Sequence, residues 1–244
     1  MPEPRISLVI PAYNEEKFLP RLLQSVEAAR LNYESTGCAM EVIVADNAST
    51  DGTARVAAER GCRVVPVQKR CIAAARNGGA RVARGQFLAF VDADFQIHPQ
   101  TFLAIEEALA SEKVIAGASG ATLERWSAGI AVSFALLVPF VWMTGFDTGV
   151  VFCRRADFEA VGGYDERRRI AEDVTLLLAL RRLGKRRGQR LVRVTRIKAI
   201  ASTRKFDEFG EWHYLKFMGL AAAYLLGLTK FEDAIERYWY RVRR

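Results

Sequence analysis

The stretch Gln86-Phe87-Leu88-Ala89-Phe90-Val91-Asp92-Ala93-Asp94-Phe95 carries the strongest pattern in the chain. Its apolar run from Phe87 to Val91 predicts a buried strand, which stops at two carboxylates, Asp92 and Asp94. Two like charges at one strand end repel each other, and an oxygen-binding cation such as Mg2+ or Mn2+ removes the repulsion. A solvated acidic turn is the alternative. The surrounding sequence has to decide between a metal site and an ordinary turn.

Strands and helices are expected to alternate around this stretch. Short apolar runs predict strands at Ile6–Ile10, ended by Pro11, at Glu41–Ala45, followed by Asp46, and at residues 63–67. Periodic segments predict helices that begin at about Lys17 and that span residues 53–60, 70–84 and 99–110. This alternation predicts the α/β class, with a doubly wound, mostly parallel sheet and helices on both faces.

Polar residues follow three of the predicted strands. Tyr13 and Glu15 come after the first strand, Asp46 ends the second, and Asp92 and Asp94 end the Phe87 strand. Ligands of doubly wound sheets bind beyond the carboxyl ends of the strands, so these clusters are expected to form one site. The first strand is not followed by Gly-x-Gly-x-x-Gly, which excludes a dinucleotide site of that type.

The second half of the chain holds further candidates. Gly162 and Gly163 are expected to cap a short helix at residues 155–161, and Glu172-Asp173 opens another helix. Acidic residues in a first turn are ordinary capping or, in the other interpretation, catalytic groups. Residues 191–200 predict one alternating strand. Paired glycines at 78–79 inside a helix indicate either a close approach by a ligand or backbone, or tight packing.

Composition and charge limit the class of protein. Half of the 244 residues are hydrophobic, which suits either one large domain or one domain with a C-terminal elaboration. The four cysteines lack Cys-x-x-Cys spacing, so neither a zinc site nor a disulfide framework is expected. The first residues do not have the pattern of a signal peptide, and a cytoplasmic location is the expectation.

The net charge of +8 is concentrated in one segment. Residues 154–205 hold sixteen Lys and Arg against six Asp and Glu. Such a segment suits an anionic membrane surface or a phosphorylated substrate, whereas nucleic acid is disfavoured because no nucleic-acid-binding motif accompanies the charge. Residues 128–146 are apolar but interrupted by Gly129 and Pro139, so a buried or membrane-facing helix is expected there, not a spanning one. Residues 217–228 are too short to span a bilayer and long enough to lie on one.

Six pieces of the sequence, in order, resemble the glycosyltransferase family 2 enzymes, which have the GT-A fold. They are Val9-Ile10-Pro11-Ala12-Tyr13-Asn14-Glu15, Val44 to Thr53 (Val-Ala-Asp-Asn-Ala-Ser-Thr-Asp-Gly-Thr), Ala75-Arg76-Asn77-Gly78-Gly79, Phe90-Val91-Asp92-Ala93-Asp94, Gly162-Gly163-Tyr164-Asp165-Glu166 and Glu172-Asp173. The resemblance implies a GT-A catalytic domain over residues 1–205, with a nucleotide-sugar half at 1–118 and an acceptor half at 119–205. A C-terminal helical extension at 206–244 would follow.

The resemblance also implies roles for individual residues. A nucleotide-diphosphate sugar would be the donor, with its base and ribose lined by the residues Pro11, Tyr13, Glu15, Asp46 and Arg76. Asp92 and Asp94 would meet ribose, diphosphate and a Mn2+ or Mg2+ ion, with Asp94 as the usual direct ligand. Asp173, beside Glu172, would be the general base. Direct displacement with inversion at the anomeric carbon is then expected, because a carboxylate can take the acceptor proton and a cation can stabilise the leaving diphosphate.

Two departures and two alternatives remain open. Asn47 stands where many relatives carry a second acid, and no firm motif follows Ile200, so His213 as a further metal ligand and Arg204 and Lys205 as diphosphate contacts rest on residue type alone. The first alternative is a sugar-nucleotide nucleotidyltransferase, which would usually carry a Gly-rich basic loop after the first strand. The second is a non-catalytic binding module for nucleotide sugars or a membrane surface. The acceptor stays unknown, with a lipid-linked or phosphorylated one favoured by the apolar and basic segments.

Overall fold

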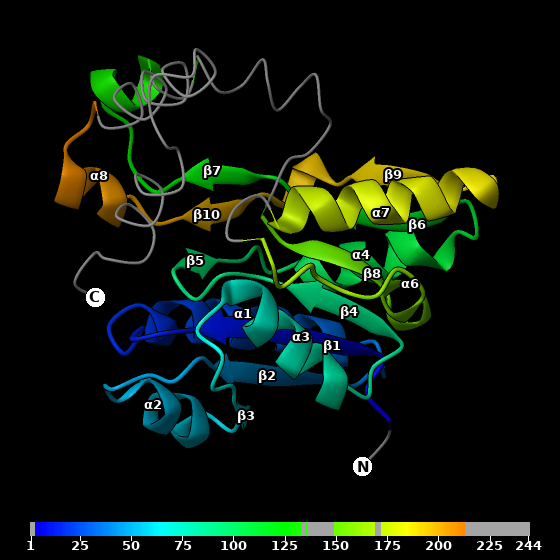
Figure 1. Ribbon diagram of the computed structural model, residues 1–244, viewed down its shortest axis with the longest axis horizontal. Helices are drawn as coiled ribbons and strands as arrows, with labels where there is room; N and C mark the ends of the chain where they lie inside the picture. The colour runs from blue at the N-terminus through cyan, green and yellow to red at the C-terminus, as the bar shows by residue number, and fades with distance from the viewer. Residues whose placement is uncertain (1–2, 133–134, 136–148, 169–171, 213–244) are drawn as a thin grey trace. The chain divides into compact units, whose positions relative to one another are not determined.

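The computed structural model describes residues 3–132, 135, 149–168 and 172–212. Its first half alternates strands and helices in the order β1 (Ile6–Ala12), α1 (Leu19–Glu34), β2 (Met40–Asp46), α2 (Thr53–Glu59), β3 (Arg63–Pro66), α3 (Ile72–Val82), β4 (Phe87–Phe90), β5 (Phe95–Gln96) and α4 (Thr101–Ala110) (Figure 1). The second half contains β6 (Val114–Ala118), β7 (Ala121–Leu123), β8 (Val151–Arg154), α6 (Arg155–Ala160), α7 (Glu172–Arg186), β9 (Arg190–Arg193), the 3-10 turn η1 (Thr195–Ile197), β10 (Ala199–Ala201) and α8 (Arg204–Phe209).

A seven-stranded sheet organises the molecule, with the strand order β3-β2-β1-β4-β8-β6-β9. β1, β2, β3 and β4 run parallel, and β8 runs antiparallel to both of its neighbours, β4 and β6. A smaller sheet has the order β5-β10-β7. The predicted α/β class with a doubly wound, mostly parallel sheet is confirmed.

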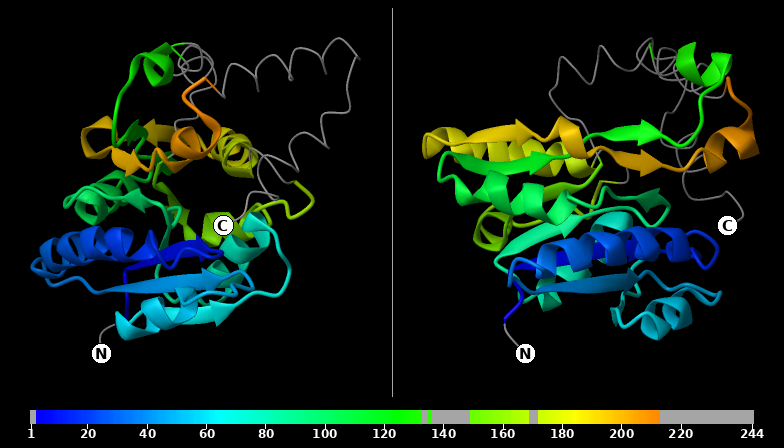
Figure 2. Two further views of the ribbon diagram at one scale, coloured as in Figure 1. Left: turned by 90° about the vertical axis from the view of Figure 1, so that its left-hand side faces the viewer. Right: turned by 180° about the vertical axis from the view of Figure 1, so that it is seen from behind.

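Alternate residues of each central strand enter two separate cores. Ile6, Leu8 and Ile10 of β1 belong to one core, with helices α1, α2 and α4, whereas Val9 belongs to the other, with α3, α6 and α7. The two views of Figure 2 show helices on both sides of the sheet. Because side chains alternate between the two faces and both faces are covered, β1 is apolar at every position except Ser7, which is buried and donates a hydrogen bond to Glu41.

Two sequence predictions are wrong in detail, and two strands were missed. β1 does not end at Ile10 but continues through Pro11 to Ala12, because its ladder with β4 stops at Val9 and the missing N–H of Pro11 costs no bond there. The single strand expected at 191–200 is divided by η1, which carries the chain from β6, the partner of β9, to β5, the partner of β10. β6 and β7 were not predicted at all.

The chain divides into two compact units. The first comprises residues 1–122 and 146–201, and the second comprises residues 123–145 and 202–244. The proposed boundary between a catalytic domain and an extension at 205/206 stays a prediction. α8 ends at Phe209, before Gly210 with its φ of 83°, and most of the helical extension expected at 206–244 lies outside the described residues.

Membrane contact by residues 128–146 and 217–228 cannot be followed in full. Residues 128–132 are helical, and most of both segments falls outside the described ranges. Among the helices that are described, none has the length and apolar character that crossing a bilayer requires.

The glycines at 78 and 79 lie inside a continuous α3, so the interruption that the sequence suggested does not occur. A Cβ at Gly79 would lie 2.4 Å from Cγ1 of Val9, and one at Gly78 would lie 2.6 Å from Cγ2 of Val67. Both glycines therefore serve packing, since they let α3 approach the strands closely.

Replacing Gly79 with alanine is expected to lower the free energy of unfolding by about 1 to 2 kcal/mol, since overpacking against Val9 outweighs the better helix propensity of alanine. Urea unfolding monitored by circular dichroism measures the change. Gly52→Ala is the matched control: its Cβ would lie 2.2 Å from a carboxylate oxygen of Glu16, but that side chain is 40% exposed and can move. Equal stability of Gly79→Ala and the wild type would contradict the packing role.

Candidate functional site

The order of strands reverses between β1 and β4. From β1 the chain proceeds to β2 and β3 on one side, and then crosses to β4 on the other. The carboxyl ends of two such strands form the topological switch point where doubly wound sheets bind ligands. Tyr13 follows β1, and Asp92 and Asp94 follow β4, so the chain places its polar clusters at this point. The expectation of one shared edge agrees with the topology.

The loops after β1 and β2 are joined by hydrogen bonds. Asn14 has a φ of 52°. In this conformation its side-chain oxygen accepts a hydrogen bond from the backbone N–H of Thr50 (2.8 Å), and its backbone N–H donates to Oγ of Ser49 (3.1 Å). The Glu15 amide donates to Thr53 Oγ1 at 2.8 Å. A short polar side chain tolerates the left-handed region better than most, which explains an asparagine here. The two loops form one rigid rim beside the switch point.

Four of the five residues that the resemblance assigned to the nucleotide lie on this rim or on the strand ends that carry it, and the fifth, Arg76, lies on α3. Pro11 is buried within β1, and Glu15 is only 3% exposed. Asp46 ends β2, and its Oδ1 accepts a hydrogen bond from the Ser49 amide at 3.3 Å. The Tyr13 ring carries the guanidinium of Arg70, 4.1 Å from its centroid. Sequence reasoning missed Arg70, although a cation beside the start of α3 was visible in the pattern.

Arg76 on α3 is the centre of the site. Its Nη2 donates to Asp92 at 2.7 Å, and its Nη1 donates to Asp173 at 2.8 Å and to Glu172 at 3.1 Å. The side chain is 3% exposed, and its Nε is buried without a partner among the described residues. Acids from the end of β4 and the start of α7 thus converge on one buried cation.

Burial and mutual charge shift the titration of this cluster. Burial alone would lower the pKa of Arg76, but the charges of Asp173 and Asp92 raise it well above its ordinary value, so the cation is permanent. Burial raises the pKa of Asp173 and of Glu172 above their ordinary ranges, although Arg76 acts against both shifts. Asp173 is therefore a stronger proton acceptor than an exposed aspartate.

Asp92 and Asp94 suit a hard divalent cation. Asp92 is 39% exposed in its side chain, and Asp94 is half-buried beside it. Within the ranges that the structure describes, no three Asp, Glu, His or Cys side chains form a group that could hold a metal ion alone. Mg2+ in nucleotide sites is commonly held by one or two carboxylates and completed by substrate phosphates and water. Two adjacent carboxylates fit that arrangement and do not form a closed protein cage.

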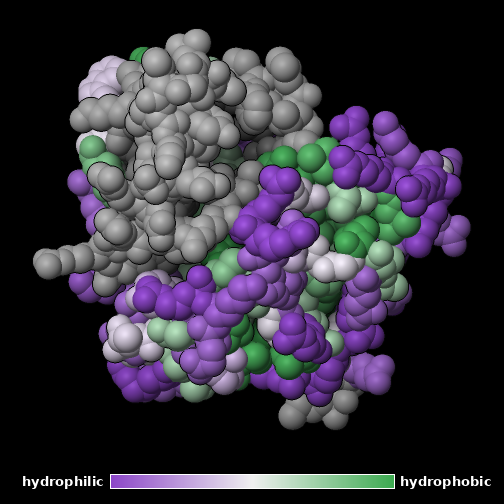
Figure 3. Space-filling model, in the orientation of Figure 1, coloured by the Kyte–Doolittle hydropathy of each residue, from purple (hydrophilic) through white to green (hydrophobic). Residues whose placement is uncertain are grey.

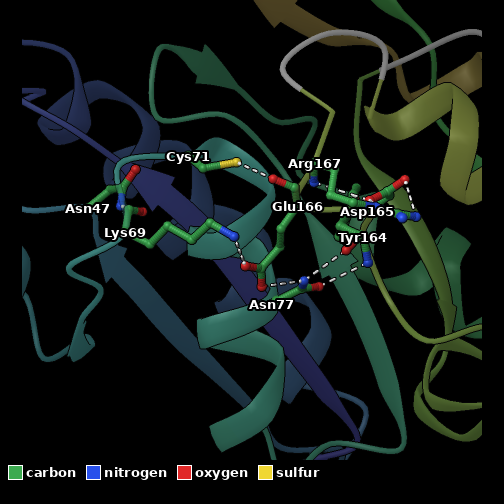
Figure 4. A network of polar contacts seen from close by, with 8 residues as sticks. All are labelled: Asn47, Lys69, Cys71, Asn77, Tyr164, Asp165, Glu166 and Arg167. Carbon is green, nitrogen blue, oxygen red and sulfur yellow. Dashed lines mark hydrogen bonds and ion pairs between the residues drawn. The ribbon is translucent and has the colours of Figure 1, made fainter.

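Asn47 has a structural explanation. Its side-chain amide donates to the carbonyl oxygens of Val67 (3.0 Å) and Lys69 (2.7 Å), and the residue is 6% exposed. A carboxylate cannot donate these bonds, so the departure from the family pattern fixes the segment that carries Lys69 and Arg70. Figure 4 shows Asn47 beside Lys69.

Sequence reasoning also missed that the Asn77 side chain holds the backbone of Tyr164, a contact called the Asn77 clamp below. The signal for it in the sequence was the match of Asn77 and of Gly162-Gly163 to the family motifs. Asn77 bonds both the N–H and the carbonyl oxygen of Tyr164 at 2.9 Å (Figure 4). The Tyr164 hydroxyl then donates to Asp173 at 2.9 Å. Both glycines have positive φ, 83° and 71°, as the predicted helix cap requires.

Three predicted residues belong to the second unit. Arg204 is the first residue of α8 in the second unit. The Lys205 side chain and the whole of His213 lie outside the described part of the chain. Their assignments to diphosphate and metal stay predictions.

Comparison with known proteins agrees with the fold. Residues 7–127 match the model of the family described as Glycosyl transferase family 2. An undecaprenyl-phosphate 4-deoxy-4-formamido-L-arabinose transferase of Pseudomonas paraeruginosa is 38% identical over 119 residues, which cover 46% of this chain and 34% of that relative. The chain thus matches about a third of the length of this curated relative.

Solved structures share the fold at low sequence identity. Staphylococcus aureus TarS 1-349 in complex with UDP-GlcNAc has a TM-score of 0.59 and 21% identity, over 82% of this chain and 58% of that one. Glucosyl-3-phosphoglycerate synthase from Mycobacterium tuberculosis, in complex with Mn2+, UDP and glucosyl-3-phosphoglycerate, has a TM-score of 0.59 and 20% identity, over 93% and 81%. The predicted GT-A fold is confirmed, and with the matched family model the chain belongs to the glycosyltransferase family 2.

Proposed function

We propose that the protein transfers a sugar from a nucleoside diphosphate sugar to an acceptor hydroxyl, with a divalent cation and with inversion at the anomeric carbon. The observation that carries the proposal is the convergence of Asp92, Glu172 and Asp173 on the buried guanidinium of Arg76. The stability of the fold does not explain such a cluster, because a buried cation and its acids are costly to remove from water unless every charge is paired. An enzyme needs these groups close together, because leaving-group and acceptor chemistry occur at one carbon.

The donor is proposed from the strand ends and from relatives. The complex of TarS contains UDP-GlcNAc, and that of glucosyl-3-phosphoglycerate synthase contains UDP with Mn2+. A uridine nucleotide is therefore the first donor to test. The rim formed by Tyr13, Glu15 and Asp46 is proposed to hold the base and ribose, and Arg70 over the Tyr13 ring adds a cation near the diphosphate.

Asp92 and Asp94 would hold the cation. A bound Mg2+ or Mn2+ supplies Lewis-acid stabilisation of the negative charge that develops on the departing diphosphate. The residues themselves orient the donor, and Arg76 holds Asp92 in place through its 2.7 Å bond. Exposure of 39% leaves Asp92 accessible to a ligand while it keeps this bond.

Asp173 is proposed as the general base. It would accept the proton of the acceptor hydroxyl while that oxygen displaces the diphosphate directly, without a covalent sugar–enzyme intermediate. Burial raises the pKa of Asp173, which makes it a better base, and the charge of Arg76 acts in the opposite direction by favouring the ionised form. Glu172, bonded to the same Nη1, supports the position of Arg76.

A lipid-linked or phosphorylated acceptor at an anionic membrane surface fits the charge distribution. The last turns of α7 and the start of β9 expose the cations Arg181, Arg182, Lys185, Arg186 and Arg190. In the orientation of Figure 1, hydrophilic surface gathers there (Figure 3). The relative from Pseudomonas paraeruginosa is an undecaprenyl-phosphate transferase, that is, a protein named for a lipid phosphate. Location on the cytoplasmic side of the membrane is part of this proposal.

No observation in the described residues favours the two alternatives. Pro11 to Glu15 do not form a Gly-rich basic loop of the kind expected in a nucleotidyltransferase, and the acids of the site are intact, unlike in a module that has lost catalysis. Incubation with a panel of nucleotide sugars and Mn2+ tests the family's chemistry directly. Absence of both binding and hydrolysis for every donor would contradict the proposed function.

Asp94→Asn and Asp173→Asn are expected to separate donor binding from catalysis. Asp94→Asn should weaken Mn2+-dependent UDP binding about tenfold or more, whereas Asp173→Asn should keep binding and lower transfer by about 10^2- to 10^4-fold. Calorimetry measures the binding, and UDP release measures the transfer. Glu106→Gln is the control, because Glu106 bonds Arg5, at the opposite end of β1. Full activity of either aspartate variant would refute its assigned role.

The pH dependence should report the raised pKa of Asp173. A base works in its ionised form, so kcat/KM should be constant above this pKa and fall about tenfold per pH unit below it. The midpoint is expected above the ordinary aspartate value of about 3.9, because burial and the charge of Asp92 raise the pKa of Asp173 more than Arg76 lowers it. Rates measured from pH 4 to 9 (about the range in which the fold is expected to hold) give the midpoint. A midpoint at or below the ordinary value would contradict the assignment.

Anionic vesicles should bind the protein through α7. Replacement of Arg182, Lys185 and Arg186 with glutamine should weaken binding to phosphatidylglycerol vesicles about tenfold or more, because each cation near such a surface contributes about 1 kcal/mol. Sedimentation at low and high salt measures the binding, with neutral phosphatidylcholine vesicles for comparison. Glutamine at the exposed Arg21, Arg55 and Arg60 is the charge-matched control. Equal binding by both triple variants would count against this surface.

A further inference from the structure

The two carboxylate oxygens of Asp173 have different surroundings. Oδ1 accepts hydrogen bonds from Nη1 of Arg76 at 2.8 Å and from the Tyr164 hydroxyl at 2.9 Å. Within the described ranges Oδ2 accepts none, and the side chain keeps 17% exposure. One oxygen is therefore held in place, and the other is left for a proton.

The Tyr164 ring is fixed by packing on three sides. It meets Phe90 edge-on at 5.1 Å and Phe158 at 5.8 Å between ring centroids, and the Arg76 guanidinium lies over it at 5.1 Å. The residue is 2% exposed. Burial and the charge of Asp173 raise the pKa of the Tyr164 hydroxyl well above its ordinary value, so the hydroxyl stays protonated and acts as a donor.

The backbone of Tyr164 is fixed by Asn77. The Asn77 side chain accepts a bond from the Tyr164 N–H and donates to its carbonyl oxygen, both at 2.9 Å, and it also donates to Glu166 at 3.0 Å (Figure 4). A Cβ at Gly163 would lie 2.8 Å from Oδ1 of Asn77, and the φ of Gly163 is 71°. A glycine at 163 is thus required for the amide to approach the chain.

Resting on the proposed function, we infer that Tyr164, seated by Asn77, is a positioning residue for the general base: it holds Oδ1 of Asp173 so that Oδ2 takes the acceptor proton. As the acceptor oxygen bonds to the anomeric carbon, its O–H bond breaks and the proton goes to Oδ2. The bond between the anomeric carbon and the diphosphate breaks at the same time, and its electron pair leaves with the diphosphate.

The hydroxyl also affects the charge state of Asp173. Hydrogen bonds to the ionised form lower the pKa of a carboxyl, and Tyr164 is one of two groups that supply them, the other being Arg76. Among the residues that the structure describes, the other titratable groups around this pair are Asp92 and Glu172, the acids that share Arg76, and the thiol of Cys153 near Tyr164. Loss of the hydroxyl should therefore raise the pKa of Asp173 and leave its Oδ1 with Arg76 as its one remaining donor among the described residues.

Tyr164→Phe tests the inference, since it removes the hydroxyl and keeps the aromatic packing. Tyr33→Phe is the matched control: Tyr33 is equally buried and donates to Glu106 at 2.8 Å, and Glu106 also bonds Arg5, which precedes β1, at the sheet edge opposite the site. Thermal unfolding shows whether each variant is folded. Asn77→Ser is a second variant. It shortens the side chain that bonds the Tyr164 backbone and leaves the Tyr164 hydroxyl in place.

The first readout needs no turnover. Carboxyl carbon resonances of 13C-labelled aspartate are titrated without metal, and the Asp173 signal is the one lost in Asp173→Asn. Tyr164→Phe should move its midpoint to higher pH, and Tyr33→Phe should not. The second readout is kinetic: Tyr164→Phe should lower kcat about tenfold, the equivalent of one hydrogen bond to a charged group. It should leave the donor KM within about twofold and move the acid limb of kcat/KM to higher pH.

An unchanged Asp173 midpoint together with an unchanged kcat in Tyr164→Phe would overturn the inference. So would an equal effect of Tyr33→Phe on both readouts. A wild-type protein that transfers no sugar from any donor would instead contradict the proposed function, and the titration would still decide whether Tyr164 controls Asp173. The two failures are therefore distinguishable.

Discussion

The burial of the Arg76 cation among three carboxylates is the constraint on which the site depends. A guanidinium that is 3% exposed has almost no water to solvate it, so acids must surround it, and here they come from the end of β4 and the first turn of α7. The same contact joins positions that are 16 and 97 residues apart in the chain. Because Arg76 sits on α3, whose glycines let it approach β1 closely, the packing of this helix sets the position of all three acids.

This arrangement joins the proposed donor side and the proposed base side of the site. Asp92 follows the strand beside the switch point, and Asp173 opens a helix on the other side of Arg76. Removing one partner from a buried ion cluster typically costs about 3 to 5 kcal/mol, since the remaining charges stay buried without compensation. A rigid, costly cluster of this kind is easier to understand at a reactive centre than in a scaffold. The clamp of Asn77 on Tyr164 extends the same rigidity to the hydroxyl that meets Asp173.

Much of the fold could be predicted from local pattern. The apolar runs at Ile6–Ile10 and Phe87–Val91 identified β1 and β4, and the acids after β4 identified the switch point. β6, Val114–Ala118, was not predicted because two of its five residues are alanine and one is glycine. Such a segment does not have the pattern of a strand, and it becomes one through pairing with β8 and β9. The break at η1 was not predicted for a related reason. Apolar and polar residues alternate from 191 to 200, but the two halves of this segment pair with strands of different sheets.

Many residues of the site could be predicted from the sequence, but the hydrogen bonds and ion pairs that join them could not. Arg76 was assigned to the nucleotide by the family resemblance, and an Ala-rich helix that holds both Arg76 and Arg81 gives no indication that one of them has three distant partners. Likewise, Asn47 could be recognised as a departure, but its two bonds to backbone carbonyls appear only once β2 and the segment after β3 lie together.

The central claim is that the edge beyond β1 and β4 binds a cation and a nucleoside diphosphate while Arg76 retains the proposed base. A crystal structure with UDP and Mn2+, in which the anomalous signal of manganese locates the ion, tests it most directly. The account predicts an anomalous peak at Asp92 and Asp94, the uridine beside Tyr13, and an intact Arg76–Asp173 bond. A peak away from both aspartates, or UDP bound elsewhere on the chain, would contradict it.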